Sequence, residues 1–210
     1  TETARAIFGA DRRDSGDIYV NGKRVDIKNP QDAVEAGIGY LSEDRKRYGV
    51  IIEKTVAENT TMASLKAFCK GLFIDKKAEK ETAEQYVEAL KTKTPSVEQQ
   101  VRNLSGGNQQ KVVIAKWLTR NCDILIFDEP TRGIDVGAKS EIYTLMNNLV
   151  KQGKSIIMIS SELTEVLRMS DRILIMCEGR KTGEISIEEA TQEKICLLYT
   201  SPSPRDRSLS

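Results

Sequence analysis

Short runs of consecutive apolar residues alternate along the chain with longer stretches in which apolar side chains recur every three or four positions. Uninterrupted apolar runs predict strands that are buried on both faces, as in a parallel sheet. They occupy residues 37–41, 124–127 and 155–159. Residues 75–90 and 139–150 show helical spacing, and we expect amphipathic helices there. The pattern predicts an α/β fold.

Turn-forming residues predict several shorter elements near the start of the chain. We expect a brief helix that ends at Gly9, a hairpin around the Asn21-Gly22 pair, and a helix that begins at Asn29-Pro30. Each of these residue types favours a turn or a helix end for a steric reason, since glycine and asparagine adopt positive φ and proline presets φ for a first helical turn.

The middle and the end of the chain differ in character. Residues 56–94 have a helical and polar pattern, interrupted by a turn near Gly71, and Pro95 breaks the pattern. The apolar run at 173–176 predicts a strand, a turn at Glu178-Gly179-Arg180 follows it, and residues 181–185 are expected to form the last strand.

Two adjacent carboxylates follow the apolar run at 124–127. Asp128 and Glu129 come directly after it, and Pro130 stops the strand. Ligand sites in open α/β sheets lie at the carboxyl ends of strands, so both acids are expected there. One of them would then hold Mg²⁺ while the other reaches an attacking water. Two solvated loop acids remain the alternative.

A serine and two glycines precede a helical run in the same region. Ser105, Gly106 and Gly107 would leave backbone N–H groups free at a helix start, and the helix dipole makes such a start attractive to anions. Glycines also allow a phosphate to approach the backbone closely. An ordinary helix N-terminus is the alternative for these three residues taken alone.

These segments, in this order and spacing, resemble the motifs of ATP-binding-cassette (ABC) ATPases. Leu104–Lys111 resembles the signature motif, Ile124–Glu129 resembles the Walker B strand with its catalytic glutamate, and Gly133–Asp135 stands where the D-loop stands. The resemblance implies a P-loop NTPase-like core with a helical subdomain and a short antiparallel β element. It implies ATP and Mg²⁺ as cofactors.

The resemblance also implies roles for particular residues. Asp128 would organise Mg²⁺ and Glu129 would act as the general base for water attack on the γ-phosphate. The signature would bind the γ-phosphate of a nucleotide that is held by a second ATPase half, while Arg132 and Asp135 would line the contact between the halves. The implied nucleotide-binding residues are Ser105, Gly106, Gly107, Gln109, Asp135, Glu43 and Ser161.

Two positions depart from the usual ABC pattern. Glu43 stands where most members have a glutamine that senses Mg²⁺ and the transmembrane partner, and Ser161 stands where a histidine usually contacts the γ-phosphate. Both departures, with the run Ser42–Lys46, resemble the second ATPase half of bacterial monosaccharide importers of the ribose, galactose and xylose type. The serine puts independent turnover at this site in doubt. A solvated charge run remains the alternative for Glu43–Arg47.

The phosphate-binding loop G-x-x-x-x-G-K-[ST] is absent from these residues. Thr1 would be its last residue, whose hydroxyl binds Mg²⁺, and the chain is then truncated at its front. A frayed terminus is the alternative for Thr1. Residues 1–194 are expected to form the ABC ATPase domain, with the helical subdomain at about 56–118. Residues 195–210 are expected to be a disordered tail, with an arginine-serine recognition segment as the alternative.

Composition narrows the remaining classes of function. The formal charge is +1, which gives no reason to invoke nucleic acid, and no apolar run approaches the length of a membrane span. The four cysteines have no paired ligand spacing and histidine is absent, which excludes a histidine base. We therefore expect reduced thiols.

The expected partners are the N-terminal ATPase half of the same transporter, transmembrane permease subunits and, indirectly, a periplasmic sugar-binding protein. The expected location is peripheral, at the cytoplasmic face of the bacterial inner membrane. Two other ABC classes stay open at this point. One is an ATPase that acts on ribosomes, and the other is a chromosome-maintenance ATPase, which would carry a long heptad coiled coil that this sequence lacks.

Overall fold

The computed structural model describes residues 1–200 of the chain. Two compact units make up this part of the chain, the first from Thr1 to Ile159 and the second from Ser160 onward. The first unit contains a parallel sheet and most of the helices, and the second contains a strand pair with two helices and a short 3-10 turn.

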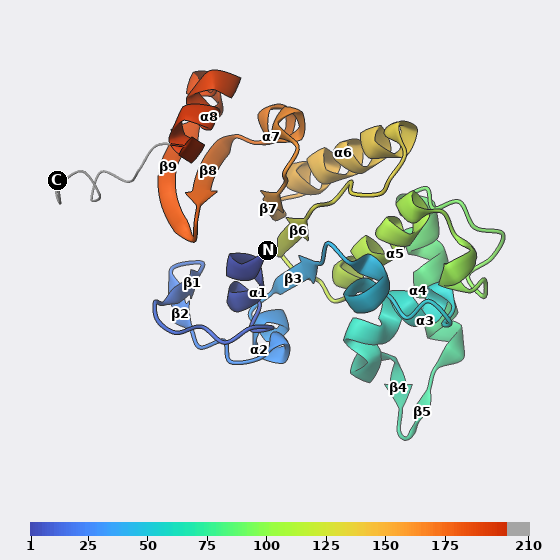
Figure 1. Ribbon diagram of the computed structural model, residues 1–210. Helices are drawn as coiled ribbons and strands as arrows, with labels where there is room; N and C mark the ends of the chain where they lie inside the picture. The colour runs from blue at the N-terminus through green and yellow to red at the C-terminus, as the bar shows by residue number, and fades with distance from the viewer. Residues whose placement is uncertain (201–210) are drawn as a thin grey trace. The chain divides into compact units, whose positions relative to one another are not determined.

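The first unit is built on a three-stranded parallel sheet in the order β3-β6-β7 (Figure 1). The strands are β3 (Ile38–Leu41), β6 (Ile124–Asp128) and β7 (Ser155–Ile159). The middle strand is the most deeply buried, since Leu125, Ile126 and Phe127 have no exposed surface. The prediction of parallel strands from these three apolar runs is confirmed.

The burial expected for β7 is wrong. Its residues are half-buried or exposed, and Ile157 keeps 46% of its surface open. The reason is its position at the edge of the sheet, where β6 is its neighbour on one side only. The apolar run therefore predicted the strand correctly and its burial incorrectly, because the edge strand and the central strand are equally apolar in sequence here.

Helices α5 (Gly106–Thr119) and α6 (Val136–Lys151) both pack against this sheet. The first, α5, is buried over most of its length, and Trp117 meets Phe8 edge to face. The second, α6, starts three residues earlier than expected, because Asp135 caps its first turn. Its buried face contains Tyr143, whereas Leu145 is only half-buried.

The short elements at the front follow their turn residues. Helix α1 (Glu2–Ile7) ends before Gly9, and β1 (Ile18–Val20) pairs with β2 (Lys23–Val25) across a turn in which both residues have positive φ. Helix α2 (Pro30–Glu35) begins with a capping box in which the Asn29 side chain accepts from two backbone N–H groups. These three predictions are confirmed.

The helical part of the first unit is less regular than the sequence pattern predicted. Helix α3 (Val56–Thr61) leads into the 3-10 segment η2 (Met62–Phe68), and α4 (Lys76–Ala89) forms as expected. Between η2 and α4 lies a hairpin of two two-residue strands, β4 (Cys69–Lys70) and β5 (Phe73–Ile74). The turn near Gly71 is therefore a hairpin turn, which a helical pattern could not indicate.

Two more short segments belong to the first unit. The π-helical turn η1 (Arg45–Gly49) follows β3, and Asp44 caps it by accepting from the N–H of Arg47. The 3-10 turn η3 (Val101–Asn103) leads into the signature segment. Across residues 1–200, no helix has the length and apolar character that spanning a membrane requires.

The second unit has its own small core. Helix α7 (Leu163–Met169) is followed by the antiparallel strands β8 (Arg172–Cys177) and β9 (Arg180–Ser186), the turn η4 (Ile187–Glu189) and helix α8 (Gln192–Thr200). Ile195 of α8 packs against isoleucines of both strands. Helix α8 thus extends into the stretch expected to be disordered, while 201–210 lie outside the described residues.

Candidate functional site

Asp128 is the most enclosed acid of the candidate site. It ends the central strand β6 with no exposed surface, and each of its carboxylate oxygens accepts one hydroxyl hydrogen bond. Thr1 Oγ1 donates to Oδ1 over 3.0 Å, and the Tyr40 hydroxyl donates to Oδ2 over 2.6 Å. The two donors satisfy a buried carboxylate that would otherwise be costly to desolvate.

Tyr40 is held in its protonated form by these surroundings. Burial, and then its hydrogen bond to Asp128, raise the pKa of the Tyr40 phenol well above its usual range. The phenol therefore remains a hydrogen-bond donor at neutral pH, and it fixes the orientation of the carboxylate from the neighbouring strand β3.

Glu129 has an unusual backbone conformation. Its φ is +50°, in the left-handed region that residues other than glycine, asparagine and aspartate rarely adopt. Its N–H donates to the carbonyl of Ile159 over 2.9 Å, so the first residue after β6 is still tied to the end of β7. This conformation costs on the order of 1–3 kcal/mol and occurs preferentially at functional sites.

The helix start at Ser105 lies against the loop that follows Glu129. A Cβ added to Gly106 would lie 3.2 Å from the carbonyl oxygen of Gly133, and one added to Gly107 would lie 2.9 Å from Cβ of Ala138. Glycine is therefore the residue that allows this close approach. The hydroxyl of Ser105 accepts from Asn108 Nδ2 and does not cap the backbone of α5.

Arg45 joins three segments of the site. Its Nη1 donates to the carbonyl of Arg132 over 3.1 Å, and its Nε lies 3.4 Å from Gln109 Oε1. Its Nη2 would lie 2.6 Å from a Cβ on Gly106. The guanidinium thus covers the first glycine of the helix start, and partial burial lowers the pKa of Arg45 from its ordinary value.

Glu43 forms a second link between the same segments, through an ion pair with Arg132. The run Glu43–Arg47 is thus not simply a solvated charge run, because Glu43 and Arg45 both have partners in the loop after β6. Lys46 and Arg47, by contrast, are exposed.

The structure brings most of the expected site residues into two neighbouring groups. One group contains Thr1 and Asp128. The other group contains Glu43, the signature glycines and the loop that follows Glu129. Asp135 caps α6 by accepting from the N–H of Ala138. Gln109 is buried and donates to the carbonyl of Val101, so its amide serves the interior.

Ser161 belongs to the second unit and is described with it. It is exposed and lies two residues beyond β7, next to Ser160, whose hydroxyl hydrogen-bonds the buried Glu165. Its expected contact with a γ-phosphate remains a prediction.

Sequence reasoning did not identify Tyr40 and Arg45 as part of this site. Tyr40 is separated from Asp128 by 88 positions, and Arg45 from Arg132 by 87. Tyr40 lies in an apolar run and Arg45 in a charge run, so composition marks neither of them. A polar hydroxyl inside a buried strand was the available signal for Tyr40, because such a group needs a partner.

The donor set around Asp128 suits Mg²⁺ in part. Hydroxyl and carboxylate oxygens are the ligands that this ion prefers, and it commonly keeps water and phosphate oxygens as its other ligands. Within residues 1–200, no group of three or more Asp, Glu, Cys or His side chains is arranged to hold a metal ion. Thr1 and Asp128 would therefore hold Mg²⁺ only together with water and a phosphate ligand.

A large hollow of about 1190 Å³ opens on the first unit beside this site. Its wall includes aromatic and apolar side chains and one buried lysine, among them Phe8, Tyr40, Tyr48, Met62, Lys116 and Trp117. Lys116 Nζ donates to the carbonyl of Gly49 over 2.6 Å, and burial lowers the pKa of Lys116 to about 8.

This shift predicts a pH-dependent stability. Between pH 8 and the ordinary lysine value near 10.5, the unfolded chain binds the proton and the folded chain does not. Across this window the free energy of unfolding of the unsubstituted chain therefore rises with pH relative to that of Lys116→Met, by at most about 1.4 kcal/mol per pH unit. Below pH 8, Lys116 is protonated in the folded chain too, and the cost of burying its charge is fully present. Urea unfolding of both proteins from pH 7 to 10.5 measures the difference.

Lys151→Met is the control, since Lys151 is an exposed lysine at the end of α6. Its free energy of unfolding should change with pH in the same way as that of the unsubstituted chain. If the free energy of unfolding of Lys116→Met also changed with pH in the same way as that of the unsubstituted chain, the assignment of a lowered pKa to Lys116 would be contradicted.

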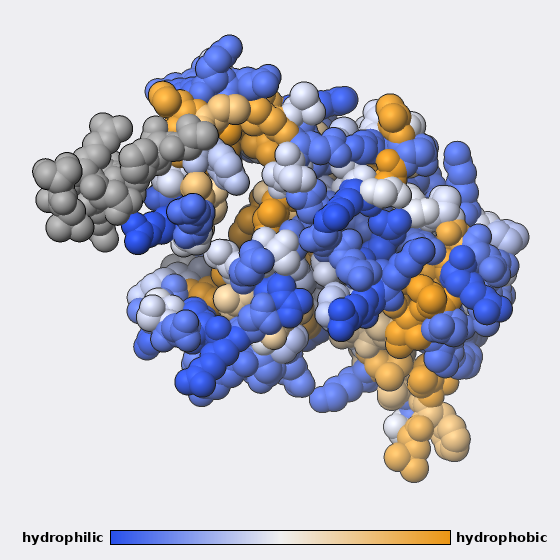
Figure 2. Space-filling model, viewed as in Figure 1, coloured by the Kyte–Doolittle hydropathy of each residue, from blue (hydrophilic) through white to orange (hydrophobic). Residues whose placement is uncertain are grey.

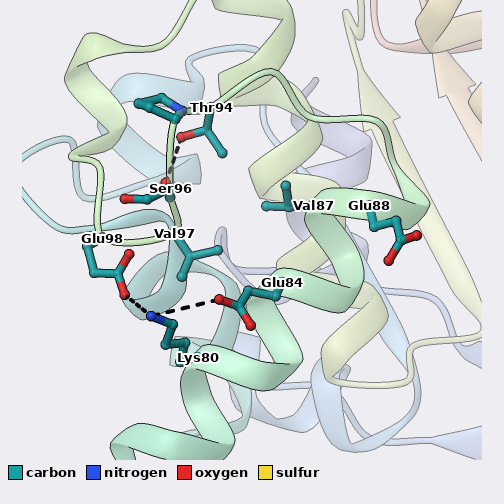
Figure 3. A pocket seen from close by; sticks show the side chains of 9 residues that line it. Lys80, Glu84, Val87, Glu88, Thr94, Ser96, Val97 and Glu98 are labelled. Atoms are coloured by element: carbon teal, nitrogen blue, oxygen red, sulfur yellow. Dashed lines mark hydrogen bonds and ion pairs between the residues drawn. The ribbon is translucent and has the colours of Figure 1, made fainter.

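A smaller hollow of about 320 Å³ lies between α4 and the segment that follows it (Figure 3). Lys80 forms ion pairs there with Glu98 over 2.7 Å and with Glu84 over 3.8 Å. Thr94 Oγ1 donates to the carbonyl of Ser96. Lys80 and Thr94 are thus paired with other residues of the hollow, and we assign it no chemistry.

The fold is shared with solved ATP-binding cassettes. MJ1267, an ATP-binding cassette of an ABC transporter, matches with a TM-score of 0.78 and 23% identity over 95% of this chain and 82% of that one. A nucleotide-free cassette from an ABC transporter matches with a TM-score of 0.75 and 22% identity over 100% and 83%. At such identities the likeness shows the fold.

Sequence comparison identifies the family. Residues 1–132 match the family model described as ABC transporter. The chain belongs to the ABC transporter family, as its motifs predicted.

Closer relatives are named as sugar import proteins. The putative ribose/galactose/methyl galactoside import ATP-binding protein 1 of Burkholderia lata is 62% identical over 95% of this chain and 39% of its own length. The xylose import ATP-binding protein XylG of Thermoanaerobacter pseudethanolicus is 57% identical over 95% and 40%, and RbsA of Bacillus subtilis, a ribose import ATP-binding protein, is 52% identical over 95% and 41%. The chain spans about 40% of the length of these relatives.

Proposed function

We propose that this chain is part of the ATP-binding and ATP-hydrolysing subunit of a bacterial monosaccharide importer, from its C-terminal ATPase half. The observation that carries the proposal is Asp128, buried at the end of the central strand, bonded to Thr1 and Tyr40 and followed by Glu129 at positive φ. The fixed carboxylate of Asp128 suits metal binding, and that of Glu129, on a strained backbone next to it, suits general base catalysis.

The proposed roles follow from this arrangement. Thr1 and Asp128 hold Mg²⁺, which neutralises charge on the phosphates when bound, and Glu129 accepts a proton from the attacking water. Ser105, Gly106 and Gly107 present a helix start to the γ-phosphate of a nucleotide that is bound by the other ATPase half. Gln109 supports that helix start from inside.

The remaining residues would join the two ATPase halves or report on the nucleotide. Arg132 and Asp135 lie in the loop that follows the proposed base, where they would face the other half. Glu43 would connect that loop to the segment after β3 through its ion pair with Arg132. Ser161 would occupy the γ-phosphate side in place of a histidine.

Transport is supported by the names of the relatives, all of which are import ATP-binding proteins for ribose, galactose or xylose. They favour sugar import over an ATPase that acts on ribosomes or DNA. The partners would then be an N-terminal ATPase half, transmembrane permease subunits and, through them, a periplasmic sugar-binding protein. The hollow beside Lys116 would receive the permease, at the cytoplasmic face of the inner membrane.

The first test concerns nucleotide binding by the 210-residue chain alone. Its residues include no G-x-x-x-x-G-K-[ST] loop, so the backbone cradle and the lysine for the β-phosphate are missing. We expect no turnover and no ATP binding tighter than about millimolar. Calorimetry with Mg²⁺ and ATP measures this, and a micromolar dissociation constant would show that the loop is dispensable.

The matched comparison is the same segment within a full-length importer. There ATP binding should be restored, and Asp128→Asn should weaken the Mg²⁺ dependence of binding. Full-length protein that hydrolyses ATP without transporting a monosaccharide would contradict the importer proposal while leaving the ATPase roles intact.

A further inference from the structure

The β4–β5 hairpin differs from the other two hairpins in the described structure. The β1–β2 turn is Asn21-Gly22 and the β8–β9 turn is Glu178-Gly179, so both have a polar residue beside the glycine. The β4–β5 turn is Gly71 followed by Leu72. A solvent-facing hairpin tip has no structural need for a leucine, because turn residues are selected for backbone conformation.

The apolar side chains of this tip are unusually open to solvent. Leu72 is 97% exposed and Phe73 is 79% exposed, while Ile74 is 37% exposed. Figure 2 shows an apolar protrusion at the place that β4 and β5 occupy in Figure 1. Neighbouring apolar residues of this size on a protruding tip are typical of a surface that is buried by something else.

Exposed lysines flank the protrusion along the chain. Residues 62–77 contain four lysines and one acid, Asp75, although the whole chain carries only +1. Lys66, Lys70, Lys76 and Lys77 are all exposed. Lys70 pairs with Asp75 across the base of the hairpin over 2.6 Å, which leaves its side chain 81% exposed. Lys76 pairs with Glu79 and Glu58, and Lys77 pairs with Glu81 over 3.8 Å, yet both side chains keep most of their surface open to solvent.

We propose that Leu72 and Phe73 insert into the headgroup region of a membrane rich in anionic lipid, with the flanking lysines bound to lipid phosphates. An apolar tip with a basic surround matches both layers of such a surface, since the apolar side chains reach the acyl boundary and the ammonium groups meet negative charge. The membrane contact goes beyond the proposed ATPase function and needs neither ATP nor a second ATPase half.

The test uses the 210-residue chain with Cys177 and Cys196 replaced by serine. An environment-sensitive fluorophore is then attached to Cys69, which is exposed on β4, while burial raises the pKa of Cys122 to about 11 and keeps it unreactive. Vesicles of phosphatidylcholine, with or without about one third phosphatidylglycerol, are added. We expect a blue shift and co-sedimentation with the anionic vesicles, and neither with the neutral ones.

The double variant Leu72→Ser/Phe73→Ser should lower the apparent partition coefficient about ten-fold or more. Lys66→Gln/Lys70→Gln should lower it as well and weaken its dependence on salt. Val150→Ser is the matched control, because Val150 is an exposed apolar residue of α6 outside the hairpin. Circular dichroism verifies that all variants remain folded.

Two results would overturn the proposal. Unchanged binding of Leu72→Ser/Phe73→Ser to anionic vesicles would remove the tip from the contact. Absence of vesicle binding by the unsubstituted chain, together with crosslinking from Cys69 to a permease subunit in an assembled transporter, would assign the tip to a protein surface. The ATPase proposal stands or falls separately, by the nucleotide measurements.

Discussion

Glu129→Gln in the full-length importer is expected to leave ATP binding intact and to slow hydrolysis at this site by roughly 10²–10⁴. Glutamine keeps the length and shape of the side chain, so the strained backbone at φ +50° is retained while the proton acceptor is lost. Single-turnover hydrolysis, with the base of the other ATPase half disabled, isolates the rate at this site.

Glu178→Gln is the matched control for this measurement. Glu178 also adopts a left-handed backbone, with φ of +48°, but it lies in the β8–β9 turn of the second unit. Its replacement should leave the rate unchanged. If Glu129→Gln also left the single-turnover rate unchanged, Glu129 would have no place in the chemistry, and the serine at position 161 would be the first residue to test by replacement with histidine.

Gly106→Asp in the assembled importer is expected to abolish transport and ATPase activity and to prevent closure of the two halves on ATP. The new carboxylate would stand where a phosphate must lie, and its repulsion of that phosphate is worth on the order of 1–4 kcal/mol at effective dielectrics between water and a protein surface. The side chain would also crowd Arg45, whose Nη2 would lie 2.6 Å from the new Cβ. ATP-driven crosslinking between the halves measures closure.

Gly106→Asn separates charge from bulk, because asparagine has the shape of aspartate without its charge. Some closure should return in this variant. The fold should survive both changes, since the nearest atom, the end of the Arg45 side chain, is able to move. Normal closure of Gly106→Asp would refute the role of the signature in binding a nucleotide from the other half.

Local sequence patterns were sufficient for the elements that rest on local chemistry. The strands β3 and β6 follow from apolar runs, and the Asn21-Gly22 turn and the cap at Asn29 follow from residue type alone. Ser105, Asp128 and Glu129 stand at ends of elements that the sequence marks, whereas their roles came from the resemblance and stay predictions.

The parts that escaped prediction depend on contacts between distant residues. The hydroxyl of Tyr40 on β3 donates to Asp128 on the neighbouring strand β6, and Arg45 donates to the loop after β6. The partners are far apart in sequence, so no local pattern indicates either contact. The β4–β5 hairpin was missed for a different reason. Its strands are two residues long, which is too short for an alternation of apolar and polar side chains to be recognised.

The left-handed backbone at Glu129 has a consequence for how this position can evolve. Glycine at position 129 would adopt the same φ without strain, so selection for folding alone would favour losing the carboxylate. Chains that keep a glutamate here sacrifice some stability to keep an acid in this place. In a library screened only for soluble expression, variants at 129 should therefore drift towards glycine or asparagine, whereas a screen for growth on the transported sugar should return glutamate.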